Sequence, residues 1–198
     1  MKLVLATQNP KKLKEMNEIL RHLGVEVVSE AELGVRIEVE ETGETFTDNA
    51  RLKATAVMQA TGLPAVADDS GLCVDALNGG PGVYSARFGG EGLDDKGRYT
   101  LLLEMLRGQT DRAAHFHTSI VCAFPNGDEL VCEGECPGTI AFAPMGEGGF
   151  GYDPVFFVPE LRKTFGQLTA EEKASVSHRG KALRAFAAAL DDYLKGNE

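Results

Sequence analysis

The chain has 198 residues, enough for a substantial core, and its 43% hydrophobic and 25% charged residues are ordinary for a globular protein. A formal net charge of −10 argues against a nucleic-acid polymer as ligand, although a local cationic pocket or a divalent metal can still bind a small phosphorylated molecule. No apolar run approaches the length of a membrane span, and the apolar start is too short for a signal peptide, so we expect a cytoplasmic protein.

The beginning of the chain predicts a β-α-β unit. Residues 2–6 are apolar and predict a buried strand, after which Asn9 and Pro10 are typical of the N-cap and first position of a helix. Apolar residues then recur with helical spacing until Gly24, and valines at 25–28 predict the next strand. This order is typical of an α/β protein with a mixed sheet and helices packed around it.

The remaining elements follow from periodicity and turn residues. A hairpin is indicated at Asn126-Gly127, and no repeat or linker is evident. We expect helices at 47–60, 94–107 and 178–194, and strands at 63–67, 72–76, 114–124, 129–133 and 139–143.

The four cysteines match no zinc-binding spacing, and a chain of this length folds without disulfides. We therefore expect free and mostly buried thiols at Cys73, Cys122, Cys132 and Cys136.

The first strand-to-helix turn is a candidate phosphate site. It carries hydroxyl, amide and ammonium groups beside a helix N-terminus, whose free N–H groups and partial positive charge attract anions. The residues are Thr7, Gln8, Asn9, Pro10, Lys11 and Lys12. The alternative is an ordinary surface helix start, in which Lys11 pairs with Glu15 one turn later.

Two acidic pairs are candidates for metal binding or general base catalysis. Asp68 and Asp69 end an apolar strand, where adjacent side chains point to opposite faces, so we expect different roles for them. One would act in the cleft as a magnesium ligand or base, and the other would brace a loop; an Asx turn using both is the alternative. Glu40-Glu41 could supply a second oxygen ligand, since magnesium is usually held by one or two carboxylates plus substrate phosphates. Lys53 and Lys173 could face either the site or solvent.

Two short segments near the C-terminus combine aromatic and polar groups. Phe150, Gly151, Tyr152 and Asp153 precede Pro154, and Ser177-His178-Arg179 follows about twenty residues later. Aromatic faces beside hydrogen-bonding groups suit a flat heterocycle with polar edges, whereas the alternative is a hairpin tip with an ordinary buried Phe.

Taken in order, these segments resemble the non-canonical purine nucleoside triphosphate pyrophosphatases, the inosine/xanthosine triphosphatase family. The resemblance spans nearly the whole chain, and the combined set is specific although each fragment alone is not. The matching stretches are residues 5–12, 40–43, 49–54, 67–72, 81–87, 148–154 and 171–180.

The resemblance implies a two-lobed α/β fold around a long mixed sheet, related to the Maf proteins, with the active-site cleft between the lobes. It implies a homodimer and Mg²⁺-dependent conversion of ITP, dITP or XTP to the monophosphate and pyrophosphate. By matching positions, residues Thr7 to Lys12 would hold the phosphates, Glu41 and Asp69 the metal, and Lys53 and Lys173 would neutralise phosphate charge. Asp69 would also be the general base and Ser70 would contact the substrate. Phe150 to Asp153 and His178-Arg179 would hold the purine.

Hydrogen bonding suggests how the purine is selected. Hypoxanthine and xanthine have an acceptor at O6 and a donor at N1, whereas adenine has the reverse, so an Asp153 carboxylate accepting from N1–H would leave adenine mismatched. Two other functions are compatible with parts of the pattern: a Maf-like pyrophosphatase acting on other nucleotides, and a non-catalytic nucleotide-binding protein. The aromatic segment argues against the first, and the set of Lys12, Glu41, Lys53 and Asp69 argues against the second.

Overall fold

A computed structural model describes residues 1–7 and 9–196, which divide into two compact units. Unit 1 comprises residues 1–69, 118–134 and 181–198, and unit 2 comprises residues 70–117 and 135–180. Across the described residues the strands follow the order β2-β1-β3-β5-β6-β7-β8, with β4 paired to β3. Parallel and antiparallel pairs both occur, so the protein has the α/β fold with a mixed sheet that the sequence predicts.

Unit 1 begins with the predicted β-α-β unit. Strand β1 (Lys2–Leu5) leads into helix α1 (Pro10–Leu20), and β2 (Glu26–Ser29) returns parallel to β1. Asn9 caps the helix, because its side chain accepts a hydrogen bond from the Lys11 backbone N–H. Strand β1 also pairs in parallel with β3 (Ala65–Val74). Leu5 at the end of β1 pairs with Val66 near the start of β3, so the turn that follows β1 lies beside the β3 residues that lead to Asp68.

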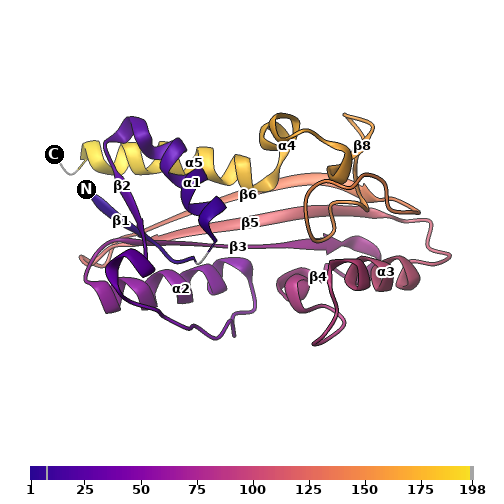
Figure 1. Ribbon diagram of the computed structural model, residues 1–198, viewed down its shortest axis with the longest axis horizontal. Coiled ribbons are helices and arrows are strands. Elements are labelled where there is room, and N and C mark those ends of the chain that lie inside the picture. The colour runs from indigo at the N-terminus through magenta and orange to yellow at the C-terminus, as the bar shows by residue number, and fades with distance from the viewer. Residues whose placement is uncertain (8, 197–198) are drawn as a thin grey trace. The chain divides into compact units, whose positions relative to one another are not determined.

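Helices cover both faces of the unit 1 strands (Figure 1). Helix α2 (Phe46–Thr61) packs small residues such as Ala50 and Ala54 against one face. On the other face, α1 and α5 (His178–Gly196) form a larger cluster with Leu3 and Leu5 of β1. The period of two along β1 explains this division, since Val4 packs on the α2 side.

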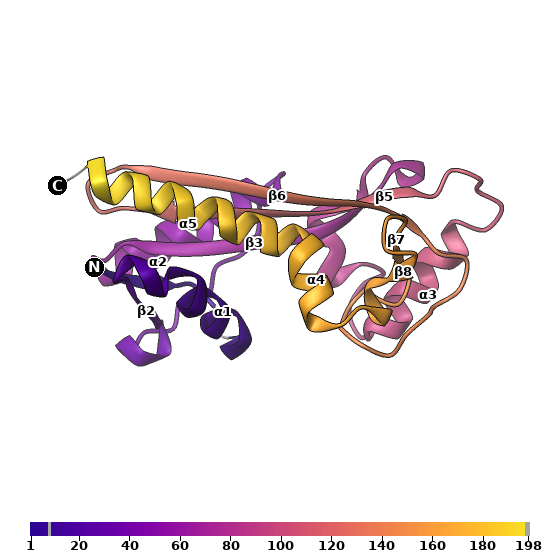
Figure 2. The same cartoon turned by 90° about the horizontal axis from the view of Figure 1, so that it is seen from above.

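Unit 2 has its own core, built around aromatic rings. Phe116, Phe156 and Phe165 pack together, with the Phe116 and Phe156 ring centroids 4.6 Å apart. Strand β7 pairs with the end of β6 and β8 pairs with β7 (Figure 2). The remaining elements with residues in unit 2 are β4 (Gly80–Pro81), α3 (Asp95–Met105), β5 (Ala113–Ala123), β6 (Glu129–Ile140), β7 (Phe156–Val158), β8 (Lys163–Thr164) and α4 (Ala170–Val176). Short 3-10 turns occur at Arg21–Leu23, Ala31–Leu33, Asp75–Leu77, Gly82–Arg87 and Phe165–Gln167.

Two strand predictions need correction. The strands expected at 63–67 and 72–76 are the single strand β3, because Asp68 to Gly71 stay extended instead of turning. The separate strand expected at 139–143 is wrong, because β6 runs without interruption from Glu129 to Ile140. The predicted helices at 47–60, 94–107 and 178–194 are confirmed as α2, α3 and α5. The sequence did not predict β4, β7, β8 or α4.

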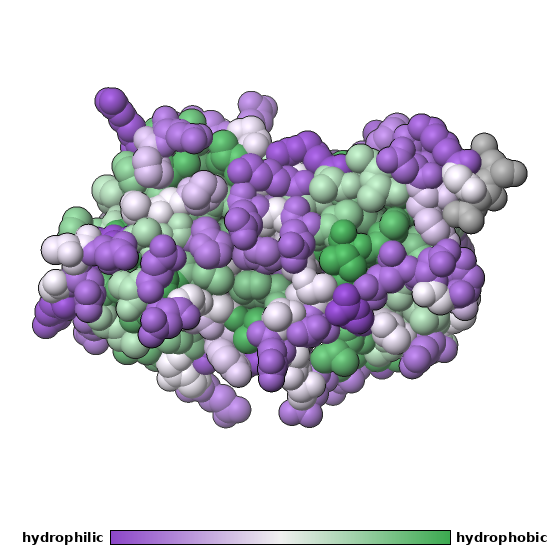
Figure 3. Space-filling model, turned by 180° about the vertical axis from the view of Figure 1, so that it is seen from behind, coloured by the Kyte–Doolittle hydropathy of each residue, from purple (hydrophilic) through white to green (hydrophobic). Residues whose placement is uncertain are grey.

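The surface, the helices and the cysteines can be compared with the expectations from composition. Hydrophilic and apolar residues alternate over the face in Figure 3. None of the helices in the described part of the chain is long and apolar enough to cross a membrane. All four cysteines are free thiols, with Cys73 half-buried and Cys122, Cys132 and Cys136 buried, as predicted.

Candidate functional site

The predicted phosphate turn lies in unit 1, between β1 and α1. The Thr7 Oγ1 atom accepts from the Asn9 N–H at 3.2 Å, and the Asn9 Oδ1 atom accepts from the Lys11 N–H at 2.9 Å. Pro10 is the first residue of α1, and the first turn contains no acidic residue to neutralise the helix N-terminus. Thr7, Asn9 and Pro10 also line a hollow of about 310 Å³. Gln8 lies outside the described residues.

The two lysines of this turn differ. Lys11 is exposed, whereas the Lys12 ammonium lies 2.7 Å from the Asp68 Oδ2 atom. The Asp68 side chain is only 3% exposed, so the carboxylate of this ion pair is nearly buried. Lys12 is therefore held against the first half of β3, at Asp68. Asp68 and Asp69 have different partners: Asp68 pairs with Lys12 of the phosphate turn, and Asp69 lies beside Lys53.

Lys53 lies among carboxylates. Its Nζ atom is 2.8 Å from the Glu41 Oε1 atom and 3.4 Å from the Asp69 Oδ1 atom, and it donates to the Asp68 carbonyl oxygen at 2.9 Å. The Lys53 and Asp69 side chains are 20% and 14% exposed. Lys53 therefore faces the acidic residues instead of solvent, and it brings the predicted metal ligands Glu41 and Asp69 to one place. We call Glu41, Lys53 and Asp69 the Lys53 cluster.

The charges of the Lys53 cluster are not balanced. Burial alone would lower the pKa of Lys53, but the surrounding charges of Asp69, Glu41 and Asp68 outweigh burial and raise its pKa above the usual value. Burial raises the pKa of Asp69, Lys53 acts in the opposite direction, and Glu41 raises it further. More negative than positive charge thus surrounds this ammonium, which favours an additional cation. Within residues 1–7 and 9–196, no three His, Cys, Asp or Glu side chains form a metal-binding group.

The sequence analysis missed Asn49, which is fully buried in α2. Its Nδ2 atom donates to the Asp69 Oδ2 atom at 3.2 Å, and its Oδ1 atom accepts from the Gly43 N–H at 2.8 Å. Asn49 therefore contacts both Asp69 and the loop that carries Glu41. An Asn among the alanines on the inner face of the predicted helix was the available signal, since a buried amide needs partners.

The predicted purine segment lies in unit 2 as a tight loop. The Asp153 Oδ2 atom accepts from the Phe150 N–H at 2.8 Å, and the Gly151 N–H donates to the Asp95 Oδ2 atom at 2.7 Å. A side chain at Gly149 would place its Cβ atom 1.9 Å from the Asp153 Oδ2 atom, so only glycine fits there. The loop is therefore fixed from two sides by carboxylates.

The two aromatic rings of this loop have different environments. The Phe150 ring is 76% exposed. Tyr152 is 5% exposed and packs in the unit 2 core, where its hydroxyl donates to the Ser85 carbonyl oxygen at 2.8 Å. Burial raises the pKa of Tyr152 to about 12. Of the two rings, that of Phe150 is thus open to a ligand, whereas the hydrophobic surface of Tyr152 stabilises the core.

Lys173 of α4 joins this loop. Its ammonium lies 2.5 Å from the Asp153 Oδ2 atom and 4.9 Å from the Phe150 ring centroid. The Asp153 side chain is 4% exposed and that of Lys173 is 23% exposed. Burial raises the pKa of Asp153, and the Lys173 charge opposes this shift. The lysine, rather than the carboxylate, is thus the more accessible of the two groups.

The other predicted residues of unit 2 are half-buried. The His178 ring begins α5 and stacks on the Phe116 ring, with centroids 4.7 Å apart and planes 12° apart. Arg179 follows in the first turn, and Ser70 follows Asp69 in β3. The structure thus places the phosphate turn and the predicted metal ligands in unit 1, and Ser70 with the purine residues in unit 2. Lys173, which was expected to neutralise phosphate charge, lies in unit 2 beside Asp153 and Phe150.

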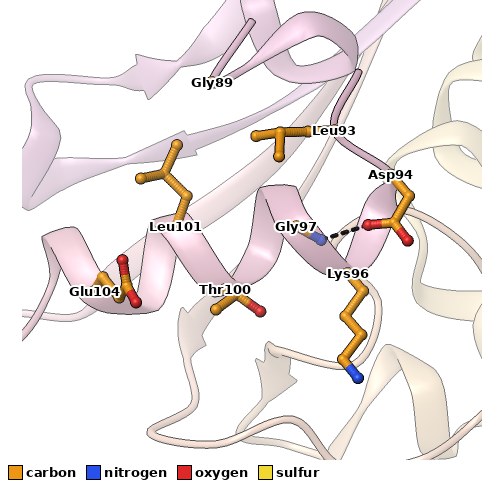
Figure 4. Close-up of a pocket in the computed structure, with 8 residues that line it drawn as sticks. All are labelled: Gly89, Leu93, Asp94, Lys96, Gly97, Thr100, Leu101 and Glu104. Atoms are coloured by element: carbon orange, nitrogen blue, oxygen red, sulfur yellow. Dashed lines mark hydrogen bonds between the residues drawn. The ribbon is translucent and has the colours of Figure 1, made fainter. Parts of the chain in front are cut away.

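A larger hollow of about 590 Å³ lies beside α3 in unit 2. Its lining includes Leu93, Leu101 and Asp94, whose carboxylate caps the helix by accepting from the Gly97 N–H (Figure 4). None of the predicted site residues lines it. The hollow is lined by α3 and the segment before it, so it does not extend the candidate site.

Together these features define an α/β protein with lysines and carboxylates gathered beside a helix N-terminus and a separate aromatic loop that holds a lysine. The chain belongs to the Ham1 family, whose model matches residues 3–189.

Close relatives support this assignment over the full length. A dITP/XTP pyrophosphatase of Exiguobacterium is 50% identical over 99% of this chain and 100% of its own length. A dITP/XTP pyrophosphatase of Desulforamulus reducens is 54% identical over 93% of this chain and 92% of its own. The solved structure of a HAM1 protein from Coxiella burnetii has a TM-score of 0.93 at 43% identity, covering 97% of this chain and 99% of that one.

Proposed function

We propose that this protein hydrolyses the non-canonical purine nucleoside triphosphates ITP, dITP and XTP to the monophosphate and pyrophosphate, which removes them from the nucleotide pool. The observation that carries the proposal is the Lys53 cluster, in which Lys53 Nζ contacts both Glu41 and Asp69. Near full-length similarity to proteins named dITP/XTP pyrophosphatases supports the choice of substrate.

The residues of unit 1 fit a magnesium ion. Glu41 and Asp69 are hard oxygen ligands, and two carboxylates are sufficient when substrate phosphates complete the coordination. The carboxylates of Glu41 and Asp69, both within 3.4 Å of the single Lys53 ammonium, leave negative charge that favours such a cation, and their charges raise the pKa of Lys53. Bound there, magnesium would reduce the negative charge of the phosphates and of the departing pyrophosphate.

Protein groups would supply the rest of the phosphate chemistry. In the proposed reaction the oxygen of a water molecule attacks the α-phosphorus while Asp69 accepts a proton from that water. The bond from the α-phosphorus to the oxygen that bridges it to the β-phosphorus breaks, and pyrophosphate leaves. Lys12 and Lys53 would stabilise negative charge on the phosphate oxygens, and so would the N-terminus of α1. Thr7, Asn9 and the adjoining backbone would orient the phosphate chain.

Residues of unit 2 would hold the purine. The exposed Phe150 ring offers a stacking surface, and Lys173 beside it can donate to O6 of hypoxanthine or xanthine. Adenine carries an amino group at that position, which cannot accept from an ammonium. Asp153 would then act by holding Lys173, since its Oδ2 atom already accepts from Lys173 and from the Phe150 N–H. Ser70, His178 and Arg179 would complete the substrate contacts.

The proposal extends to assembly and location. We infer a homodimer, as the family resemblance implies, and a cytoplasmic location, in keeping with a small nucleotide substrate. Size-exclusion chromatography with light scattering tests the first, and a dimer mass is the expected result.

The test of the activity is a panel of ITP, dITP, XTP, ATP, GTP and dTTP with Mg²⁺, scored separately for pyrophosphate and orthophosphate. The expected result is pyrophosphate release from ITP, dITP and XTP with slow turnover of ATP. Preferential hydrolysis of pyrimidine or modified nucleotides would instead indicate a Maf-like pyrophosphatase. Binding of ITP without any product would indicate a nucleotide-binding protein.

A further inference from the structure

Asn49 connects two parts of the candidate metal site. It is 0% exposed, and both ends of its amide are used. The amide oxygen accepts from the Gly43 N–H at 2.8 Å, and the amide nitrogen donates to the Asp69 Oδ2 atom at 3.2 Å. Gly43 lies two residues after Glu41, so a single buried side chain contacts Asp69 and the loop that carries Glu41.

The chemistry of these partners fixes the orientation of the amide. The Gly43 N–H can only donate, so the oxygen of Asn49 must face it and the NH₂ group must face Asp69. The two oxygens of Asp69 are then distinguished: Oδ1 faces the Lys53 ammonium at 3.4 Å, and Oδ2 faces the Asn49 amide. The carboxylate is thus held in one rotational position by donors on either side.

Gly43 shows how closely this loop approaches α2. A Cβ atom at position 43 would lie 2.6 Å from the Asp48 Cβ atom, 2.7 Å from the Asn49 Oδ1 atom and 2.8 Å from the Asn49 backbone nitrogen. No side chain fits without moving the loop or the helix. Close packing against α2 and the hydrogen bond to Asn49 both involve Gly43, so together they fix the backbone two residues after Glu41.

We propose that Asn49 is a positioning residue that sets Glu41 and Asp69 relative to each other for a divalent cation and the attacking water. This inference rests on the proposed function, and it adds to that function a residue that touches neither substrate nor metal. Alanine would be the better helix former at position 49, yet it could make neither hydrogen bond. The presence of Asn at position 49 is therefore explained by its hydrogen bonds in the candidate site and not by its helix propensity.

The test compares Asn49→Ala, which removes both hydrogen bonds, with Gly43→Ala, which forces the loop and α2 apart while keeping the Asn49 and Asp69 side chains. The matched control is Asn17→Ala, because Asn17 is also a helical Asn of unit 1 and donates to the Leu13 and Val27 carbonyl oxygens, each at 3.2 Å. Three quantities are measured for each protein: the Kd for Mn²⁺ alone by electron paramagnetic resonance, the melting temperature without metal, and kcat and KM for ITP.

If Asn49 positions the ligands, both site variants bind Mn²⁺ about tenfold more weakly or worse, and kcat falls about tenfold or more with a smaller change in KM. Asn17→Ala leaves the Mn²⁺ Kd unchanged. The inference is overturned if the site variants lose only melting temperature and bind Mn²⁺ normally, or if the unsubstituted protein binds no Mn²⁺. Should the unsubstituted protein bind Mn²⁺ but not hydrolyse ITP, the proposed function fails, and the Mn²⁺ titration still decides the role of Asn49.

Discussion

The buried carboxylate of Asp153 holds the ammonium of Lys173 close to the ring of Phe150. The Lys173 Nζ atom lies 2.5 Å from Asp153 and 4.9 Å from the Phe150 centroid, and a second ring, that of Phe165, lies 5.2 Å away. Two aromatic faces and one carboxylate therefore restrict a side chain that is otherwise among the most flexible. A restricted cation can favour an acceptor at one position of a purine.

Asp153→Asn tests this arrangement. The asparagine can still accept from the Phe150 N–H, but it loses the charge that holds Lys173. We expect kcat/KM for ITP to fall about tenfold or more, with little change in kcat/KM for ATP. The ratio of kcat/KM for ITP to that for ATP therefore decreases. Lys173→Met should have the same effect, and the double variant should be no worse than either single one. An unchanged ratio in both variants would remove this pair from purine selection.

Asp69→Asn tests the general base. The amide keeps the shape of the side chain and cannot accept a proton from water at neutral pH. We expect kcat for ITP to fall about 10²–10⁴-fold, while calorimetry still detects ITP binding. A kcat close to that of the unsubstituted protein would place the base elsewhere.

Lys12→Met tests the ion pair with Asp68. The substitution leaves a nearly buried carboxylate without its cation, which should lower the free energy of unfolding by about 1–3 kcal/mol and raise KM for ITP. The control is Lys14→Met, because Lys14 is 77% exposed and its 3.8 Å pair with Glu18 lies on the surface. Urea denaturation should show a lower free energy of unfolding for Lys12→Met than for Lys14→Met. Equal values would show that the Lys12–Asp68 ion pair stabilises the fold no more than a surface ion pair does.

The thiols give a prediction about pH. Cys73 is half-buried whereas the other three are buried, and burial together with Glu135 and Asp75 raises the pKa of Cys73. A raised pKa means less thiolate at neutral pH, so iodoacetamide should label native protein slowly at pH 7 and faster as the pH rises toward the raised pKa. Mass spectrometry should find the label on Cys73 first. Early labelling of Cys122 would contradict the packing of the unit 1 core.

The sequence predicted the elements that depend on local signals. The Asn9-Pro10 start of α1 and the hydrophobic period of α2 and α5 were sufficient, because caps and amphipathic spacing are local. Strand β6 was predicted as two strands, at 129–133 and 139–143, and the residues between them include Pro137 and Gly138. Gly138 allows close packing, since a Cβ atom there would lie 2.6 Å from the Phe156 ring and from the Phe157 carbonyl oxygen. Strand β7, which makes that contact, is distant in sequence.

In the candidate site, too, local signals were predictable from the sequence and contacts between distant segments were not. The sequence indicated Lys12 from its place at a helix start, and the two acidic pairs that contain Glu41 and Asp69 as candidate metal ligands; the choice of Glu41, Lys53 and Asp69 came from the family resemblance. It did not indicate that Asp68 pairs with Lys12, that Tyr152 is buried, or that Asn49 links Gly43 to Asp69. Each of these depends on contacts between segments far apart in the chain. Helix α4, which presents Lys173, had a local signal in the capping box of Thr169 and Glu172 that was not used.

The most direct test of the proposed reaction is the position at which water attacks. ITP and Mg²⁺ are incubated with the protein in ¹⁸O-enriched water, and the products are examined by ³¹P NMR. Attack at the α-phosphorus, as proposed for water activated by Asp69, predicts pyrophosphate without label and IMP that carries one ¹⁸O atom. Label in pyrophosphate or orthophosphate, or the formation of IDP, would contradict the account.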